Sequence, residues 1–176
     1  METCEEETSV ISADEYLRAV RQRFVAAGCA VTEEAIGSLP VVVGYRAKVR
    51  LLTRMHSFAV VAKVERVDEE SLRGFVDDVV NLGLGRKGQW RGMQSGVIVL
   101  PILVAEAVDP AAAALTQKAY RLNLNGFAAM AQPAVVDVTA GRVWTFRGTR
   151  LWGYAFNSLI KQSYEAYLPE PAAELS

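Results

Sequence analysis

The sequence predicts an α/β fold of the mixed-sheet, α+β kind, in which helices flank a central mixed β-sheet. Two observations support this class. Apolar residues recur every three or four positions in residues 12–28 and 68–83 but alternate in residues 29–67, so helical and strand segments follow one another along the chain. Residues 97–105 are almost all apolar, which is typical of a strand covered on both faces. The expected element order is αβββαβαββα.

The first helix has a start signal and a stop signal. Ser12 and Glu15 form a capping box, in which the two side chains accept hydrogen bonds from backbone N–H groups of the first turn. Gly28 is placed to end the helix, because glycine readily adopts the left-handed conformation found at helix termini. The apolar residues between these signals have helical spacing: Ala13, Leu17, Val20, Phe24 and Ala27.

A meander of three strands is expected next. The strands are predicted at roughly residues 29–36, 40–53 and 57–67, with residues 54–57 as a turn. Successive side chains of a strand leave on opposite faces, so the second strand is expected to carry a cationic row on one face: Arg46, Lys48 and Arg50. Lys63 of the third strand is expected to extend this row. Such a row is either a solvated sheet face or part of a surface that binds anions.

The remaining elements are predicted from caps, turns and apolar runs. They are a helix from Asp68 to Gly83, the strand at residues 97–105, a helix from Asp109 to about residue 121, a hairpin of residues 133–138 and 142–146, and a closing helix at about residues 151–168. Pro101 has no N–H to donate, so its strand is expected to contain a bulge or to expose an edge near its middle. Asp137 is expected to face solvent, because it alternates with Val136 and Val138. Residues 123–131 show no clear pattern.

Composition excludes several classes of protein. The chain has 19 basic and 20 acidic residues and a net charge of −1, which argues against a dedicated nucleic-acid or membrane-surface protein. No apolar run is long enough to cross a membrane, and two cysteines without a disulfide framework indicate the reducing cytoplasm. Residues 1–11 are expected to be an acidic flexible tail, residues 12–168 a single domain and residues 169–176 a C-terminal tail.

The segment 85–96 is rich in glycine and basic residues. Its functional candidates are Arg86, Lys87, Trp90 and Arg91, because the cations suit phosphate or carboxylate and the indole can stack on a ring. Residues 83–88 match GxGxxG, but they follow a helix and precede a strand, the reverse of the dinucleotide-binding order. The alternatives are a loop that binds an anion, nucleotide or nucleic acid, and an ordinary exposed connection.

Residues 12–105 combine a helix, three strands, a second helix and a buried strand. This element order resembles the core of the restriction-endonuclease-like PD-(D/E)xK nucleases. The resemblance implies a magnesium site made by an acid on the second core strand and a (D/E)xK triplet on the third. Aligned by element, Lys63 takes the place of the triplet lysine, but Val61 stands where its acid is expected. The resemblance therefore implies a degenerate nuclease-like fold with a binding or scaffolding role.

Three functions are compatible with these observations. The leading hypothesis is a non-catalytic cytoplasmic domain that acts through protein association, mainly as a homo-oligomer such as a homodimer, without cofactor, metal or membrane. The aromatic candidates for its interface are Trp144, Trp152, Tyr154 and Tyr164. The second is a binding module for an anionic ligand or nucleic acid. The third is an enzyme that uses His56, the single histidine, with Ser57 or Ser95.

Overall fold

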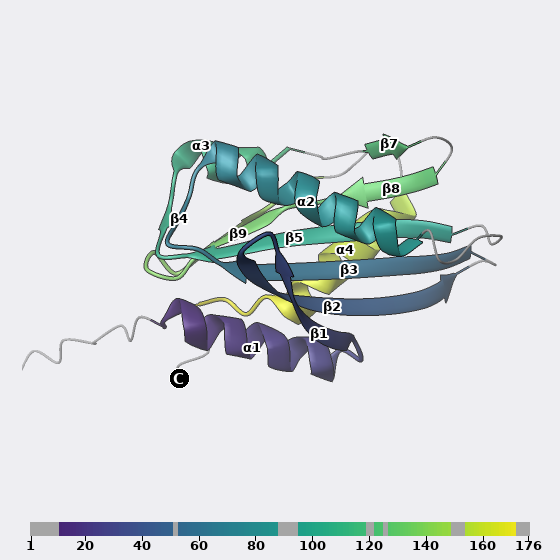
Figure 1. Ribbon diagram of the computed structural model, residues 1–176, viewed down its shortest axis with the longest axis horizontal. Coiled ribbons are helices and arrows are strands. Elements are labelled where there is room, and N and C mark those ends of the chain that lie inside the picture. The colour runs from purple at the N-terminus through teal and green to yellow at the C-terminus, as the bar shows by residue number, and fades with distance from the viewer. Residues whose placement is uncertain are drawn as a thin grey trace, which may run out of the picture.

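Helices cover both faces of a mixed β-sheet (Figure 1). The computed structural model describes residues 11–50, 53–87, 95–118, 122–124, 127–148 and 154–171. Within these ranges it contains four helices and a sheet with parallel and antiparallel neighbours, so the predicted fold class is confirmed. No helix in these ranges is long and apolar enough to cross a lipid bilayer.

The elements follow the predicted order, with four short strands added. The helices are α1 (Ala13–Ala26), α2 (Glu69–Lys87), α3 (Pro110–Thr116) and α4 (Tyr154–Tyr167). The long strands are β1 (Ala30–Ile36), β2 (Leu39–Arg50), β3 (Thr53–Lys63) and β5 (Ser95–Ala105). The shorter strands are β4 (Arg66–Val67), β6 (Ala107–Val108), β7 (Leu122–Leu124), β8 (Phe127–Ala131), β9 (Ala134–Asp137) and β10 (Arg142–Thr145).

The sheet is an antiparallel meander extended by parallel strands. β1, β2 and β3 pair in sequence order, and β3 pairs in parallel with β5. The far side of β5 pairs in parallel with two strands in turn, first β8 and then β9. β7 pairs antiparallel with β8, and β10 pairs antiparallel with β9. β4 and β6 form a separate parallel pair.

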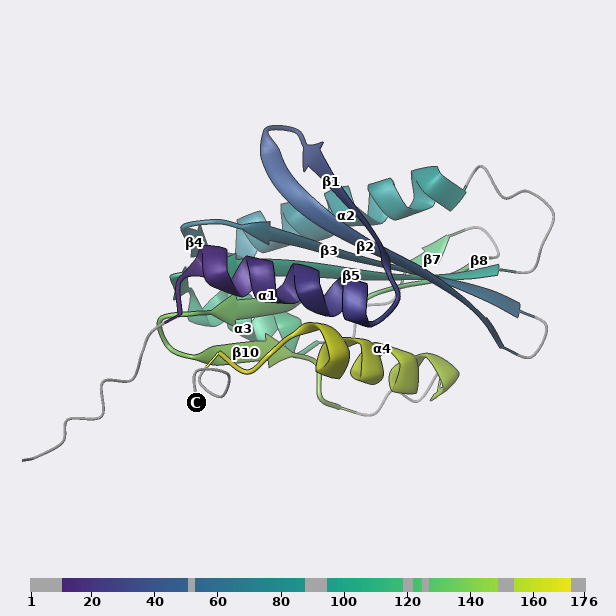
Figure 2. The same cartoon turned by 90° about the horizontal axis from the view of Figure 1, so that it is seen from below.

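Each face of the sheet has its own apolar core. Helices α1 and α4 cover one face and α2 and α3 cover the other, as Figures 1 and 2 show together. Adjacent residues of one strand alternate between the two cores: Val42 and Val61 pack under α1 and α4, whereas Val43 and Val60 pack under α2 and α3. Both faces of β2 and β3 are therefore buried along much of their length, whereas the residues of β1, at the edge of the sheet, are half-buried or exposed.

Helix α1 begins and ends as predicted. The Ser12 hydroxyl accepts a hydrogen bond from the Glu15 backbone N–H at 3.2 Å, and the Glu15 carboxylate accepts one from the Ser12 N–H at 2.9 Å. Gly28 has a φ of 77°, so it supplies the left-handed conformation that follows the helix.

The predicted turn at residues 54–57 is wrong. β3 already begins at Thr53, and β2 pairs with it without interruption from Val41 opposite Ala62 to Arg50 opposite Thr53. His56 is thus a strand residue with 2% of its surface exposed, and not a turn histidine. Parallel pairing with β5, which begins opposite Arg54, stabilises this stretch as a strand in spite of its mixed composition.

The second helix continues past its predicted end. Gly83 was expected to terminate it, but α2 runs to Lys87, so Arg86 and Lys87 belong to its last turn and not to a glycine-rich loop. A Cβ atom at Gly83 would lie 3.1 Å from Cγ2 of Val99 on β5. Glycine at this position allows α2 to approach the sheet closely, and this packing outweighs its low helix propensity.

Pro101 lies where β5 changes partners, and β5 itself is continuous. β8 pairs with residues 97–99, β9 pairs with residues 102–105, and Gln132 and Pro133 connect the two. The Val99 carbonyl accepts a hydrogen bond from the Gln132 N–H on the side of β5 that faces β8 and β9. The backbone nitrogen of Pro101, two residues later, is directed to the same side. The missing N–H therefore falls in the gap between β8 and β9. The edge of β5 is unpaired near its middle, as expected, because the neighbouring strand is interrupted there.

The C-terminal part contains one confirmed hairpin and two corrections. β9 and β10 pair antiparallel around Gly141, whose φ is 62°. Helix α3 ends at Thr116, short of the expected residue 121. Asp137 is 8% exposed and does not face solvent, because its carboxylate accepts a hydrogen bond from the Ala140 backbone N–H at 2.7 Å and so stabilises the turn.

Candidate functional site

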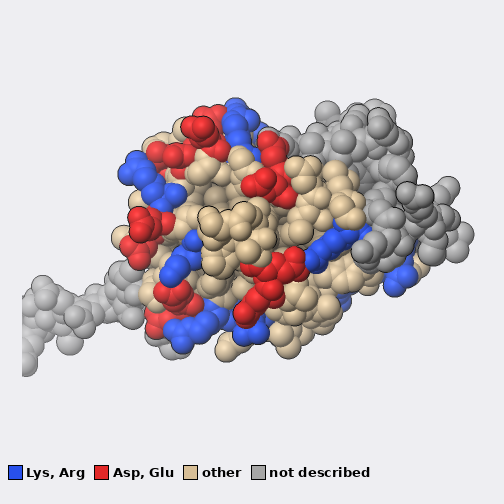
Figure 3. All heavy atoms as spheres, in the orientation of Figure 1, with Lys and Arg blue, Asp and Glu red and all other residues tan. Residues whose placement is uncertain are grey.

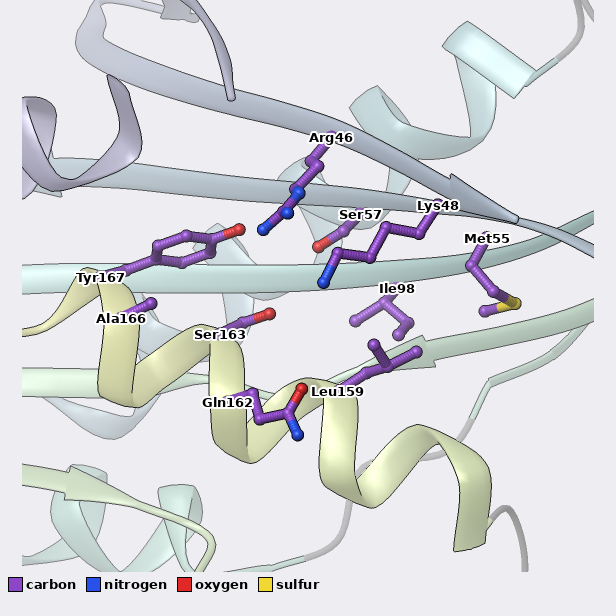
Figure 4. Close-up of a pocket in the computed structure, with 10 residues that line it drawn as sticks. All are labelled: Arg46, Lys48, Met55, Ser57, Ile98, Leu159, Gln162, Ser163, Ala166 and Tyr167. Carbon is purple, nitrogen blue, oxygen red and sulfur yellow. The ribbon is translucent and has the colours of Figure 1, made fainter. Parts of the chain in front are cut away.

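A pocket with a volume of about 60 Å³ lies between the sheet and helix α4 (Figure 4). Strand pairing assembles its floor: Arg46 of β2 lies opposite Ser57 of β3, and Ser57 lies opposite Ile98 of β5. Two pairs further along, and so on the same face, Lys48 lies opposite Met55. All five residues line the pocket, and they lie on the face of the sheet that α1 and α4 cover.

Helix α4 forms the opposite wall. Leu159, Ser163 and Tyr167 line the pocket and are spaced by four residues, so they lie on one side of the helix. Ile160 and Tyr164 on the neighbouring stripe are each 6% exposed and hold the helix on the core. Ser163 is therefore a polar residue on the buried side of an amphipathic helix.

The two cations of the pocket are not paired with any described carboxylate. None of the pocket's described lining residues is acidic, and neither Arg46 nor Lys48 forms an ion pair with a carboxylate in the described ranges. The side chain of Arg46 is half-buried and that of Lys48 is exposed. Positive charge thus accumulates beside α4 without a neutralising partner from the described chain.

The Tyr167 hydroxyl lies at one end of the pocket. It accepts a hydrogen bond from the Cys29 thiol, with an Sγ–O distance of 3.4 Å. Burial, reinforced by Cys29, raises the pKa of Tyr167 to about 12, and a hydrogen bond with Ser163 and the charge of Arg46 oppose this rise. The hydroxyl is therefore protonated near neutral pH and can donate a hydrogen bond to an anion.

The pocket has a polar end and an apolar end. In Figure 4 the side chains of Arg46, Ser57, Ser163 and Tyr167 converge at one end. Three apolar side chains lie at the other end, beyond the Lys48 side chain: Met55, Ile98 and Leu159. Met55 and Ile98 are 8% and 2% exposed, so the apolar end is largely closed off from solvent.

Lys63 does not extend the cationic row to this pocket. It lies on the same face of the sheet as Ser57 but six residues further along β3, which corresponds to about 20 Å of strand. There it forms an ion pair with Asp14 of α1, with an Nζ–Oδ1 distance of 2.7 Å. The predicted row is therefore divided, and only its Arg46–Lys48 part lines the pocket.

Arg86 lies on the opposite face of the sheet. Its guanidinium is 5.9 Å from the centroid of the Phe58 ring, under α2, and forms an ion pair with Glu34 of β1. Partial burial opposes ionisation of Glu34, but hydrogen bonds from Arg86 and Thr32 outweigh it, so the pKa of Glu34 is held below its ordinary value. The charge of Arg86 is thus already neutralised within the protein.

The other predicted binding residues lie outside the described part of the structure. Trp90 and Arg91 fall in residues 88–94, and of Arg50 and Lys87 only the backbone is described. Arg86 is the one basic residue of the segment 85–96 whose side chain the structure describes, and it faces away from the pocket. The structure therefore does not join this segment to the cationic row of Arg46, Lys48 and Arg50, and anion binding by the segment stays a separate prediction.

His56 and Ser57 are not brought together. Neighbouring strand residues point to opposite faces, so Ser57 lines the pocket while His56 contacts Tyr45 on the α2 side, with an Nδ1–O distance of 2.9 Å. The side chain of Ser95 lies outside the described residues. The enzyme hypothesis therefore receives no support from the His56–Ser57 pair.

One of the four aromatic interface candidates is a core residue. Tyr164 is 6% exposed and its hydroxyl donates a hydrogen bond to the Gln132 carbonyl. Trp144 on β10 is half-buried, while Trp152 and the side chain of Tyr154 lie outside the described part. Tyr164 is thus explained by packing, and the other three stay candidates.

Comparison with known proteins does not assign a family or a function to this chain. No family model, no curated protein and no solved structure matches this chain. The order of helix, three strands, helix and strand that resembles the PD-(D/E)xK core is present from α1 to β5, but β4 interrupts it and the relation to that family stays a prediction. In the described ranges, no cluster of three or more metal-ligating side chains occurs.

The α4 residues of the pocket were missed in the sequence. A signal was present: Ser163 lies midway between Leu159 and Tyr167 on a stripe that is otherwise apolar. A polar residue on the buried side of a helix indicates a polar partner or cavity. Only the docking of α4 onto β2 and β3 shows that the partner is a cationic pocket.

Proposed function

We propose that this protein binds a small anion in the pocket between α4 and strands β2 and β3. The observation that carries the proposal is the convergence of Arg46 and Lys48 on a site whose described lining contains no acid. The Arg46 guanidinium has a planar array of donors that suits carboxylate or phosphate oxygens. The hydroxyls of Ser57, Ser163 and Tyr167 supply further donors.

The two cations have different roles. Arg46 is half-buried, where an ion pair is less screened than in water, so it contributes most of the binding energy. Lys48 is exposed, and its charge mainly attracts the anion to the pocket. Replacing Arg46 should therefore weaken binding more than replacing Lys48.

The distribution of charge favours a small ligand over a nucleic acid. Arg46 and Arg86 lie on opposite faces of the sheet, and Arg86 is paired with Glu34. Figure 3 shows the α2 side of the molecule, opposite the pocket (Figure 2), and there basic side chains are interspersed with acidic ones over the described part. The described surface of the α2 side therefore lacks the continuous basic track that a nucleic-acid backbone requires, and Arg86 does not extend the Arg46–Lys48 site.

The test is an NMR titration of the full chain with sodium acetate and with sodium phosphate at constant ionic strength. Wild type should show saturable shifts in the amides of β2, β3 and α4. Arg46→Gln should weaken binding by at least about tenfold, since a charge-assisted hydrogen bond contributes about 1.5–3 kcal/mol. Lys48→Gln should weaken it less.

Lys161→Gln is the matched control for these variants. Lys161 lies on α4 with 80% of its side chain exposed and does not line the pocket, so the same change of charge should leave anion binding unchanged. Circular dichroism of each variant checks that α4 is still folded. Equal binding by wild type and a folded Arg46→Gln variant would overturn the proposal.

Self-association is the second candidate function. Two large apolar side chains of the described part are strongly exposed, and the more exposed of them, Val49 near the end of β2 at 72%, is the candidate for the interface; the other is Val25 at 62%. A homodimer that covers Val49 would leave the α4 pocket intact, because Val49 and Lys48 point to opposite faces of the strand. The two functions are therefore independent and are tested separately.

A further inference from the structure

We propose that the anion bound in the α4 pocket is a carboxylate with a short apolar tail, of the size of butyrate. This inference rests on the proposed function and deepens it by naming the class of ligand. It comes from the division of the pocket into a polar and an apolar end, a feature that binding of a bare inorganic anion does not need.

The polar end suits a carboxylate head group. Arg46 offers a planar pair of donors, and Ser57 lies opposite it on the neighbouring strand. The Tyr167 hydroxyl is protonated near neutral pH and lies at the same end. A carboxylate has two oxygen atoms, and the guanidinium of Arg46 and the hydroxyls of Ser57 and Tyr167 offer donors for both.

The apolar end suits a short hydrocarbon tail. Met55, Ile98 and Leu159 come from three different elements and meet beyond Lys48 (Figure 4). Leu159 is half-buried, so a methylene group placed between it and the inner side chains of Met55 and Ile98 leaves water. A phosphate in the same place would bring oxygen atoms against these side chains without hydrogen-bond partners, which costs free energy.

The volume limits the length of the tail. A cavity of about 60 Å³ has room for roughly four to six water-sized groups, since one water molecule needs about 10–15 Å³ of cavity. A carboxylate uses three heavy atoms, so about one to three carbons of the tail are enclosed. Carbons beyond these extend past the pocket and contribute little.

The experiment compares four probes on the full chain by NMR titration at constant ionic strength: acetate, butyrate, hexanoate and inorganic phosphate. Each buried methylene contributes about fourfold in affinity, so butyrate, with two more methylenes than acetate, should bind about fifteenfold more tightly. Hexanoate should bind within about twofold of butyrate, because the enclosed space is already filled. Phosphate should bind more weakly than butyrate, and n-butanol, which lacks the charge, should bind at least about tenfold more weakly.

Two variants at one position separate the tail from the head group. Leu159 is half-buried on α4, and Leu159→Gln should bring butyrate down to the affinity of acetate while leaving acetate unchanged. Leu159→Met keeps the position apolar and should retain the preference for butyrate. Circular dichroism confirms that both variants keep the helix. If Leu159→Gln fails to fold, the chain-length series on wild type still decides the question.

The outcomes distinguish this inference from the function on which it rests. A preference for butyrate over acetate that depends on Leu159 supports the inference. Equal binding of acetate and butyrate, or tighter binding of phosphate, overturns the apolar-tail ligand while leaving anion binding through Arg46 in place. No saturable binding of any anion overturns both proposals.

Discussion

Phe24 of α1 occupies the space that a side chain at Gly44 of β2 would need. A Cβ atom at Gly44 would lie 2.7 Å from Cδ2 and 2.8 Å from Cγ of the Phe24 ring, which is itself fully buried. Phe24 also packs edge-on against Tyr167 of α4, with ring centroids 5.0 Å apart. Contact between α1 and the sheet, and the position of Tyr167 at the pocket, therefore depend on glycine at residue 44.

Gly44→Ala should destabilise the protein by about 1–3 kcal/mol, because the ring is close-packed and must shift to admit the methyl group. Gly74→Ala is the matched control. Gly74 lies in α2, where an added methyl group would meet nothing within 4 Å, so the same change should stabilise the helix by about 0.5–1 kcal/mol. Urea unfolding measures both. Equal stability of the two variants would show that Phe24 does not limit residue 44.

Glu34→Gln should reduce stability at neutral pH by about 0.5–1 kcal/mol, a small effect because the Arg86 pair is partly solvated. The pKa of Glu34 is lower in the folded than in the unfolded protein, so its contribution is complete above the ordinary value of 4.5 and is lost as the pH falls through the folded value. The difference between wild type and Glu34→Gln should narrow as the pH drops below 4.5. A difference that widens on acidification would contradict the lowered pKa.

Tyr16→Phe should destabilise the protein by about 1–2 kcal/mol, since it removes a buried hydrogen bond and leaves a carbonyl unsatisfied. The Tyr16 hydroxyl donates to the Pro169 carbonyl at 2.7 Å and is buried. Because this bond joins α1 to the segment after α4, amide exchange around Leu168 should also become faster. Unchanged exchange there, with unchanged stability, would mean that the bond does not anchor this segment.

The protein should form a dimer when measured by size-exclusion chromatography with light scattering. Val49→Asp should shift it to monomer if the end of β2 is the interface, because a buried, unpaired carboxylate opposes association. Val25→Asp is the control, since Val25 is likewise exposed, at 62%, but belongs to α1 and not to β2. A wild-type monomer at high protein concentration would exclude self-association.

Elements defined by local chemistry could be predicted from the sequence. The capping box of Ser12 and Glu15 and the left-handed Gly28 set the limits of α1 without help from the rest of the molecule. The β9–β10 hairpin was predictable for the same reason, because Gly141 permits its turn. In each case the residues that decide the structure are close together in the chain.

Elements decided by tertiary packing could not be predicted in this way. Residues 54–57 look like a turn, but pairing with β5 makes them part of β3. Gly83 looks like a helix stop, but close contact with Val99 keeps it inside α2. The alternation of residues 46–50 showed that Arg46 and Lys48 share a face, whereas the helix that covers them lies more than a hundred residues later. The strand side of the pocket could therefore be predicted from the sequence, whereas the α4 side could not.

The pocket's two walls come from segments far apart in the chain, β2 and β3 on one side and α4 on the other. During synthesis the strands leave the ribosome long before the last helix does. A nascent chain therefore carries the cations but has no place to hold a ligand until α4 has been synthesised. Ligand present in the cell would stabilise only chains that include α4, and products truncated before it would gain no such protection from proteolysis.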